Sequence, residues 1–294
     1  MSRDHGYFPN GSVLRRVHRE RAVGLLYGQR ALAIGAIDPR NFVGTLDHTR
    51  ARERPFHRLI ATAKMFEEII FGTKADADRV LSAVHGMHSR VKGELAEDAG
   101  EMPAGTPYSA LDSELMLWTI APAADSALCF YELFVRKLSD ADRDSFWAEY
   151  VRFGELFGMD PAIAPASWGE FREYFDAKVN GPGAHLTPEA LVVGRAVMLE
   201  IPTPPSRWPA MRVHNVVIKA SLPKRVRELY GLRLTAAERA AARAGVEASR
   251  RVRPLTPRSV LRGRCTAHFD LVAETERALI RSGRSAPGAI PRAA

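Results

Sequence analysis

The segment PFHRLIATAKMFEEIIFG, residues 55–72, decides the fold class of this chain. Its apolar residues recur at the three- and four-residue spacing of an amphipathic α-helix, not in the alternation of a strand. Pro55 suits a first helical turn and Gly72 suits a helix end, so we predict one helix across the segment. The apolar positions are Leu59, Ile60, Phe66, Ile69, Ile70 and Phe71.

Helical spacing continues on both sides of this segment. Residues 75–92 predict the next helix, with Gly93 as its end. Residues 12–37 predict one or two helices with a break near Gly28, and the polar residues 94–107 predict a loop long enough to cover a site. Further helices are expected at 112–119, 121–134, 140–157, 167–179, 187–200 and 235–250.

The overall pattern predicts an all-α fold, because period-two alternation is nearly absent. We expect a single mostly helical domain over residues 12–270, with flexible tails at 1–11 and 282–294. The N-terminus lacks a signal-peptide pattern, and no segment reaches the roughly 18 apolar residues that span a bilayer. Two cysteines without Cys-x-x-Cys spacing disfavour a thiolate metal site or disulfide scaffold and favour a cytoplasmic location.

Charge is distributed unevenly along the chain. Residues 201–294 hold 19 Lys and Arg against 6 Asp and Glu, whereas the remaining residues hold 23 against 28. A basic region of this kind suits nucleic acid or anionic lipid, but it also occurs on ordinary arginine-rich helices. Aromatic residues do not interleave with these arginines, so no nucleic-acid partner is expected.

The segment HGMHSRVKG, residues 85–93, is the strongest candidate for chemistry. His85 and His88 are three residues apart and share one face of a helix, and Arg90 and Lys92 follow them. A neutral imidazole that faces an apolar interior can ligate haem iron, and basic side chains suit the haem propionates. The spacing alone does not distinguish this role from that of ordinary histidines.

Other catalytic patterns are absent from the sequence. It contains no Gly-x-Ser-x-Gly elbow, no His-Glu-x-x-His zinc helix and no glycine-rich phosphate loop after a strand. Glu67 and Glu68 lack the histidine three residues later that a di-iron bundle requires. Hydrolase, nucleotide-binding and di-iron functions are therefore not indicated.

Several short motifs occur in a fixed order along the chain, and together they carry a family resemblance. They are SVLRRV (12–17), RLIAT (58–62), FG (71–72), HSRVKG (88–93), Tyr108, DSELMLW (112–118), DS (125–126), LSDADR (138–143), ELFG (155–158), LPKRVR (222–227) and YGL (230–232).

In the order and spacing of these motifs, the chain resembles the haem-dependent oxygenases that include the latex-clearing rubber oxygenases and the fungal mycophenolic-acid pathway oxygenase. The resemblance covers residues 12–175 and continues more weakly over 187–270. It implies a helical domain with one haem b in a central pocket between helices, and dioxygen as co-substrate. The segment RLIAT fits the family pattern Arg-x-x-x-Thr, and HSRVKG fits His-x-x-Val-x-Gly.

Carried over onto these motifs, the resemblance implies that His88 is the iron ligand and that His85 is a second histidine of the haem site. The alternative, with His85 as ligand and His88 behind it, stays open. Arg58 and Thr62 would line the haem pocket and act in catalysis by positioning oxygen. Arg58 could instead pair with a haem propionate, or form a surface ion pair with Glu53 or Asp47.

Two positions depart from the family pattern. Rubber-cleaving members carry a lysine directly before the motif threonine, where this chain has Ala61. Many relatives carry a histidine two residues after the tryptophan that corresponds to Trp118, where this chain has Ile120. These departures favour haem binding over cleavage of polyisoprene specifically.

Three functions follow from the sequence. The first is a haem-dependent oxygenase acting on a hydrophobic, unsaturated small-molecule or lipid-like substrate, with peripheral membrane contact as an option. The second is a haem-binding or interaction protein of the same fold without the chemistry. The third is a basic helical protein that binds nucleic acid or anionic lipid through residues 207–264. The sequence leaves the oligomeric state open.

Overall fold

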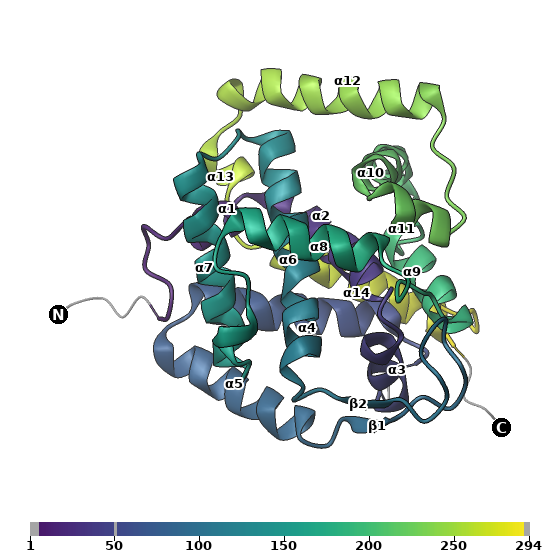
Figure 1. Ribbon diagram of the computed structural model, residues 1–294. Coiled ribbons are helices and arrows are strands. Elements are labelled where there is room, and N and C mark those ends of the chain that lie inside the picture. The colour runs from purple at the N-terminus through teal and green to yellow at the C-terminus, as the bar shows by residue number, and fades with distance from the viewer. Residues whose placement is uncertain (1–5, 50–51, 291–294) are drawn as a thin grey trace.

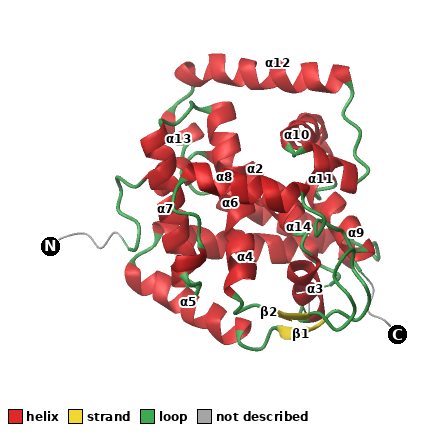
Figure 2. Cartoon of the chain, in the orientation of Figure 1, coloured by secondary structure: helices red, strands yellow, loops and turns green. Residues whose placement is uncertain are grey.

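In the computed structural model, residues 6–49 and 52–290 are described, and they form a predominantly helical fold (Figure 2). The described residues contain fourteen α-helices and one two-stranded antiparallel sheet, which confirms the predicted all-α fold. The first half contains α1 (Val13–His18), α2 (Arg21–Gly35), α3 (Pro39–Asp47), α4 (Pro55–Phe71), α5 (Lys74–His88), β1 (Lys92–Glu94), β2 (Pro107–Ser109), α6 (Ser113–Phe134) and α7 (Asp140–Leu156).

The second half adds further helices, of which α10 and α12 lie at the top of the view in Figure 1 and α9 lies at the right. Short 3-10 turns η1, η2 and η3 separate several of them. The elements are η1 (Pro161–Ile163), α8 (Trp168–Asn180), α9 (Pro188–Leu199), η2 (Pro205–Arg207), α10 (Trp208–Ser221), α11 (Lys224–Leu229), α12 (Ala236–Val252), η3 (Arg253–Leu255), α13 (Arg258–Leu261) and α14 (Thr266–Arg281).

The helix α6 runs through the middle of the molecule, with α2, α7 and α8 packed around it (Figure 1). Its residues are apolar on nearly every face, which is the pattern of a fully buried helix. Pro122 lies inside α6 without ending it, so the helix that opens in 112–119 continues past Pro122 through 121–134. The core around α6 is rich in fully buried aromatic side chains, including Trp118, Phe130, Phe146, Trp147, Tyr150 and Phe171.

Most predicted helices are confirmed, but two boundaries were wrong. The helix predicted at 75–92 ends at His88, and the chain then forms β1. The break expected near Gly28 lies instead between α1 and α2, at Arg19 and Glu20. Glu20 is buried and forms ion pairs with Arg253 and Arg262. Long-range contacts from the C-terminal region therefore stabilise the chain where α1 ends and α2 begins.

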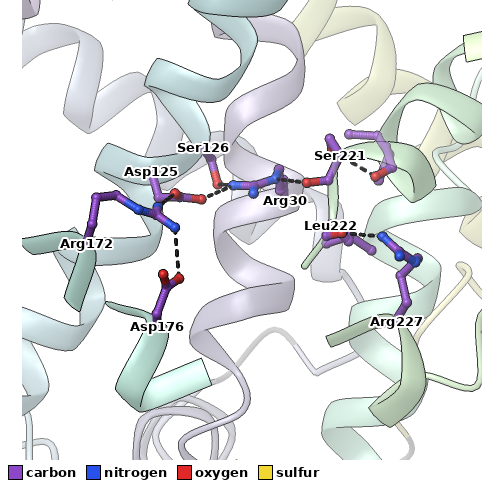
Figure 3. A network of polar contacts seen from close by, with 9 residues as sticks. Arg30, Asp125, Ser126, Arg172, Asp176, Ser221, Leu222 and Arg227 are labelled. Carbon is purple, nitrogen blue, oxygen red and sulfur yellow. Dashed lines mark hydrogen bonds and ion pairs between the residues drawn. The ribbon is translucent and has the colours of Figure 1, made fainter. Parts of the chain in front are cut away.

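A buried polar network joins α2, α6 and α8 (Figure 3). The guanidinium of Arg30 on α2 donates to Asp125 at 2.6 Å and to Ser126 at 2.8 Å, and its Nε donates to the carbonyl of Ser221. Arg172 on α8 pairs with the other oxygen of Asp125. The Asp125 carboxylate therefore has two cationic partners, which a charge in the interior requires.

The described parts of both tails lie against the helical body. Phe8 is buried, although flexibility was expected for residues 1–11. Ala286 is buried, and the backbone N–H of Ile290 donates to the carbonyl of Arg52 at 3.1 Å, although flexibility was expected for 282–294. Residues 1–5 and 291–294 lie outside the described part of the chain.

The helices described above lie within residues 6–49 and 52–290. None of the helices found there is both long and apolar enough to cross a bilayer.

Candidate functional site

The helix α4 carries Arg58, Thr62 and Phe66 on one face, since each lies four residues after the one before. The helix α5 packs along α4 and ends at His88. A capping box between Thr73 and Asp76 begins α5. Its last turn tightens, because the N–H groups of Arg90 and Val91 bond to carbonyls only three residues back. The candidate ligand therefore lies at a fixed helix end.

The two residues that follow His88 in the family pattern, Val91 and Gly93, meet α3 and β2. Gly93 is paired with Tyr108 across the sheet, and a Cβ added at Gly93 would lie 2.6 Å from the Tyr108 hydroxyl. A Cβ at Gly44 on α3 would lie 3.0 Å from the same ring and 3.7 Å from Val91. The Tyr108 hydroxyl donates to Asp47 at 3.0 Å. This packing explains why a glycine is needed five residues after the histidine.

His88 is a half-buried imidazole against aromatic side chains. Its ring stacks with that of Phe157, which follows α7, at a centroid distance of 6.4 Å. Phe157 also contacts Phe66 of α4 and Phe153 of α7. The Nδ1 atom of His88 is buried and has no hydrogen-bond partner among the described residues. Such orphaned polar atoms are uncommon in folded proteins.

The electrostatics around His88 favour the neutral imidazole. Desolvation lowers the pKa of His88, and the nearby charges of His85 and Arg58 lower this pKa further. Only a neutral imidazole has a lone pair for a metal. The structure therefore brings Arg58, His85 and His88 together and keeps His88 in the form that can bind iron.

Arg58 is half-buried, and its Nη1 donates to the carbonyl of Thr45 on α3 at 2.6 Å. Desolvation lowers the pKa of Arg58. Within the described residues Arg58 forms no ion pair, whereas Asp47 pairs with Arg52 at 3.6 Å. The alternative of a surface ion pair between Arg58 and Asp47 or Glu53 is therefore wrong.

The other positions singled out by sequence differ in exposure. Thr62 is half-buried, and His85 is exposed. Ala61, which takes the place of a lysine, is also exposed. Ile120, which takes the place of a histidine, is buried, and its Cδ1 lies 3.1 Å from a Cβ built on Gly154 of α7. Both departures therefore leave an apolar side chain where relatives have a base.

Sequence reasoning missed a second buried cluster on an adjacent face of α4. His18 is buried, and the Tyr150 hydroxyl lies 2.6 Å from its Nε2. Burial lowers the pKa of His18 to about 3, so the ring is neutral and shares a hydrogen bond with the tyrosine hydroxyl. His18, Tyr27 and Glu67 line a hollow with room for about one water molecule. Because 132 residues separate His18 from Tyr150, no local sequence signal identifies the pair.

The residues around His88 fit a haem. A porphyrin supplies four nitrogen ligands, so the protein needs to add only an axial ligand, and His88 offers a neutral imidazole with an unpaired nitrogen. Phe157 stacks on one side of it, and Arg58 supplies a nearby cation for a carboxylate. In residues 6–49 and 52–290, no group of three or more His, Cys, Asp or Glu is arranged to hold a metal ion.

Comparison with known proteins gives one match. Residues 15–251 match the model of the family described as ER-bound oxygenase mpaB/B'/Rubber oxygenase, catalytic domain. No curated protein and no solved structure matches significantly. The match confirms the resemblance seen in the motifs, and it extends through α10, α11 and most of α12, where the motifs are sparse.

Proposed function

Because this chain belongs to the family of MpaB and rubber oxygenase catalytic domains, we propose that it is a haem b-dependent oxygenase. Its co-substrate is dioxygen, and its substrate is a hydrophobic, unsaturated small molecule or lipid-like compound. Membership of an oxygenase family makes oxidoreductase chemistry the class of activity. The haem, the substrate class and the residue roles are the proposal.

The observation that carries the proposal is the state of His88. A buried nitrogen without a partner is costly unless a ligand satisfies it. His88 combines this orphaned nitrogen with a depressed pKa and a place in the family pattern His-x-x-Val-x-Gly. His85 is exposed one turn earlier, which favours His88 over His85 as the iron ligand.

In this function the side chains of α4, α5 and α7 have separate tasks. His88 would hold the iron, and the haem would supply the dioxygen chemistry when bound. Phe157 excludes water from the side of His88 on which it stacks, and Phe66 and Phe153 pack against Phe157. Arg58 and Thr62 would orient polar groups of the bound molecules on this side of α4, since Arg58 is anchored through Thr45 and keeps further N–H donors.

The first experiment compares His88→Ala with His85→Ala after expression with haem supply. Haem content is measured from the Soret band and by chemical extraction of haem, and thermal melting checks the fold. We expect His88→Ala to lose the bound haem, while His85→Ala retains it. Full haem content in His88→Ala, or loss only in His85→Ala, would remove His88 from the ligand role.

A second candidate, a haem carrier of the same fold, is motivated by Ala61 and Ile120, which replace two basic side chains of relatives. Oxygen consumption with a panel of terpenoid and fatty alkenes separates the two functions. An oxygenase consumes oxygen and forms oxygenated product with at least one alkene, and Thr62→Val lowers the rate without removing haem. A carrier binds haem and consumes no oxygen above the level of free haem.

A further inference from the structure

Residues 250–264 form the most basic short segment of the chain, with six arginines and no acidic residue. They comprise the end of α12, the turn η3, the short helix α13 and the residues up to α14. In Figure 1 this segment lies at the upper left, below the C-terminal end of α12, whereas α5 lies at the bottom. The segment is therefore well separated from the His88 site.

This segment surrounds an open hollow of about 280 Å³. The lining side chains are Arg253, Arg258, Arg262, Pro254, Thr256 and Leu261. The size suits a small polar group, and three guanidinium groups around one hollow suit a phosphate.

The charges at the hollow are only partly neutralised. Glu20, which is buried, accepts from Arg253 at 2.7 Å and from Arg262 at 2.8 Å. One carboxylate therefore fixes two arginines and cancels one of their charges. Arg258 is exposed and has no ion pair within the described residues. The hollow keeps a net positive charge in a fixed arrangement.

Exposed aliphatic side chains lie next in sequence to residues that line the hollow. Leu255 is 85% exposed, Val252 is 57% exposed and Val260 is 56% exposed. A single exposed aliphatic residue is ordinary on a protein surface, but three beside a cationic hollow mark an interaction site. The segment contains no aromatic residue for stacking on bases, and contact with nucleic acid would leave the aliphatic side chains in water.

We propose that residues 250–264 bind the surface of an anionic phospholipid membrane. The hollow between Arg253, Arg258 and Arg262 takes a headgroup phosphate, and Leu255, Val252 and Val260 enter the boundary between headgroups and acyl chains. Basic side chains and apolar side chains together are the combination that holds peripheral proteins at a membrane. This proposal does not depend on haem binding or on the oxygenase activity.

The experiment is flotation of the full chain with two kinds of vesicle, phosphatidylcholine alone and phosphatidylcholine mixed with phosphatidylglycerol. We expect binding to the mixed vesicles only, and weaker binding as salt rises. Arg258→Glu is expected to lower the partition coefficient roughly tenfold and to flatten its salt dependence. Leu255→Ser is expected to lower it by a similar factor while the salt dependence stays.

The matched control is Arg225→Glu, an exposed arginine on α11, away from the segment in Figure 1. It makes the same charge change and is expected to alter binding by less than about twofold. Thermal melting confirms that each variant folds. Equal loss in Arg225→Glu and Arg258→Glu, or equal binding to neutral and anionic vesicles, would overturn the proposal. Binding of duplex DNA or of inorganic phosphate without binding of mixed vesicles would overturn it as well.

Discussion

Two of the regions that bury polar side chains differ in whether those side chains have partners. The Arg30 guanidinium donates to Asp125 and Ser126 of α6 and to the carbonyl of Ser221, and Asp125 has two cationic partners (Figure 3). At the end of α5, the Nδ1 of His88 is buried with no partner in the described residues.

This difference separates structural from functional use of a buried polar group. A satisfied network fixes the relative positions of helices, because removing one member leaves the others uncompensated. An unsatisfied nitrogen contributes nothing to folding and instead costs free energy. Its presence next to aromatic side chains therefore needs another explanation, and a ligand that arrives after folding provides one. Substitutions at Arg30, His18 and His88 test this distinction through stability alone.

The largest effect is expected for Arg30→Met. Met fills much of the volume but leaves the buried Asp125 with Arg172 as its only cationic partner, so we expect unfolding free energy to fall by about 3–5 kcal/mol. The measurement is urea unfolding of the purified protein.

The control for Arg30→Met is Arg152→Ala, which removes an exposed ion pair to Glu155 at 2.9 Å. An exposed pair of this kind contributes less than about 1 kcal/mol. If both variants lose similar amounts of stability, the network around Arg30 does not have the structural role that its burial indicates.

An intermediate effect is expected from the titration of His18. Burial lowers the pKa of His18 to about 3 in the folded protein, against an ordinary value of 6.5. The unfolded chain therefore binds more protons between these values, and stability is retained above pH 6.5 and lost as the pH falls toward 3. At a pH of about 5 the expected loss is about 2 kcal/mol.

The check on His18 is the pH dependence of urea unfolding in His18→Gln, which keeps a side-chain acceptor near Tyr150 and does not titrate. Its stability should fall less between neutral pH and a pH of about 5 than that of the unchanged protein. An identical pH dependence in both proteins would show that His18 is not the group responsible.

The sequence predicts the parts of this structure that depend on local patterns. Apolar spacing and the residues at helix ends locate α4, α7 and α12. A helix shows this spacing regardless of which other element packs against its apolar face. The order of the motifs predicts the family, which the family match confirms. It also predicts that His88 and Arg58 lie near each other, and in the structure the charge of Arg58 lowers the pKa of His88.

The remaining features depend on contacts between distant residues. The break between α1 and α2 is held by Arg253 and Arg262, more than two hundred residues away from Glu20. The end of α5 at His88 is set by the pairing of Gly93 with Tyr108, which helical spacing through Val91 does not reveal. The same reason explains why the pairs of His18 with Tyr150 and of Arg30 with Asp125 were not predicted.

The smallest effect is expected for His88→Leu. The experiment asks whether this substitution raises or lowers the unfolding free energy. Leucine removes the unpaired nitrogen and adds apolar contact with Phe157, so haem-free protein should gain about 1 kcal/mol of unfolding free energy. His18 gives the opposite expectation, because His18→Leu removes the hydrogen-bond partner of the buried Tyr150 hydroxyl. The unfolding free energy of this variant should fall by about 1–3 kcal/mol. Urea unfolding of both variants without haem measures the two changes. A clear loss of stability in His88→Leu would mean that His88 supports the fold, and its orphaned nitrogen would then no longer indicate a ligand.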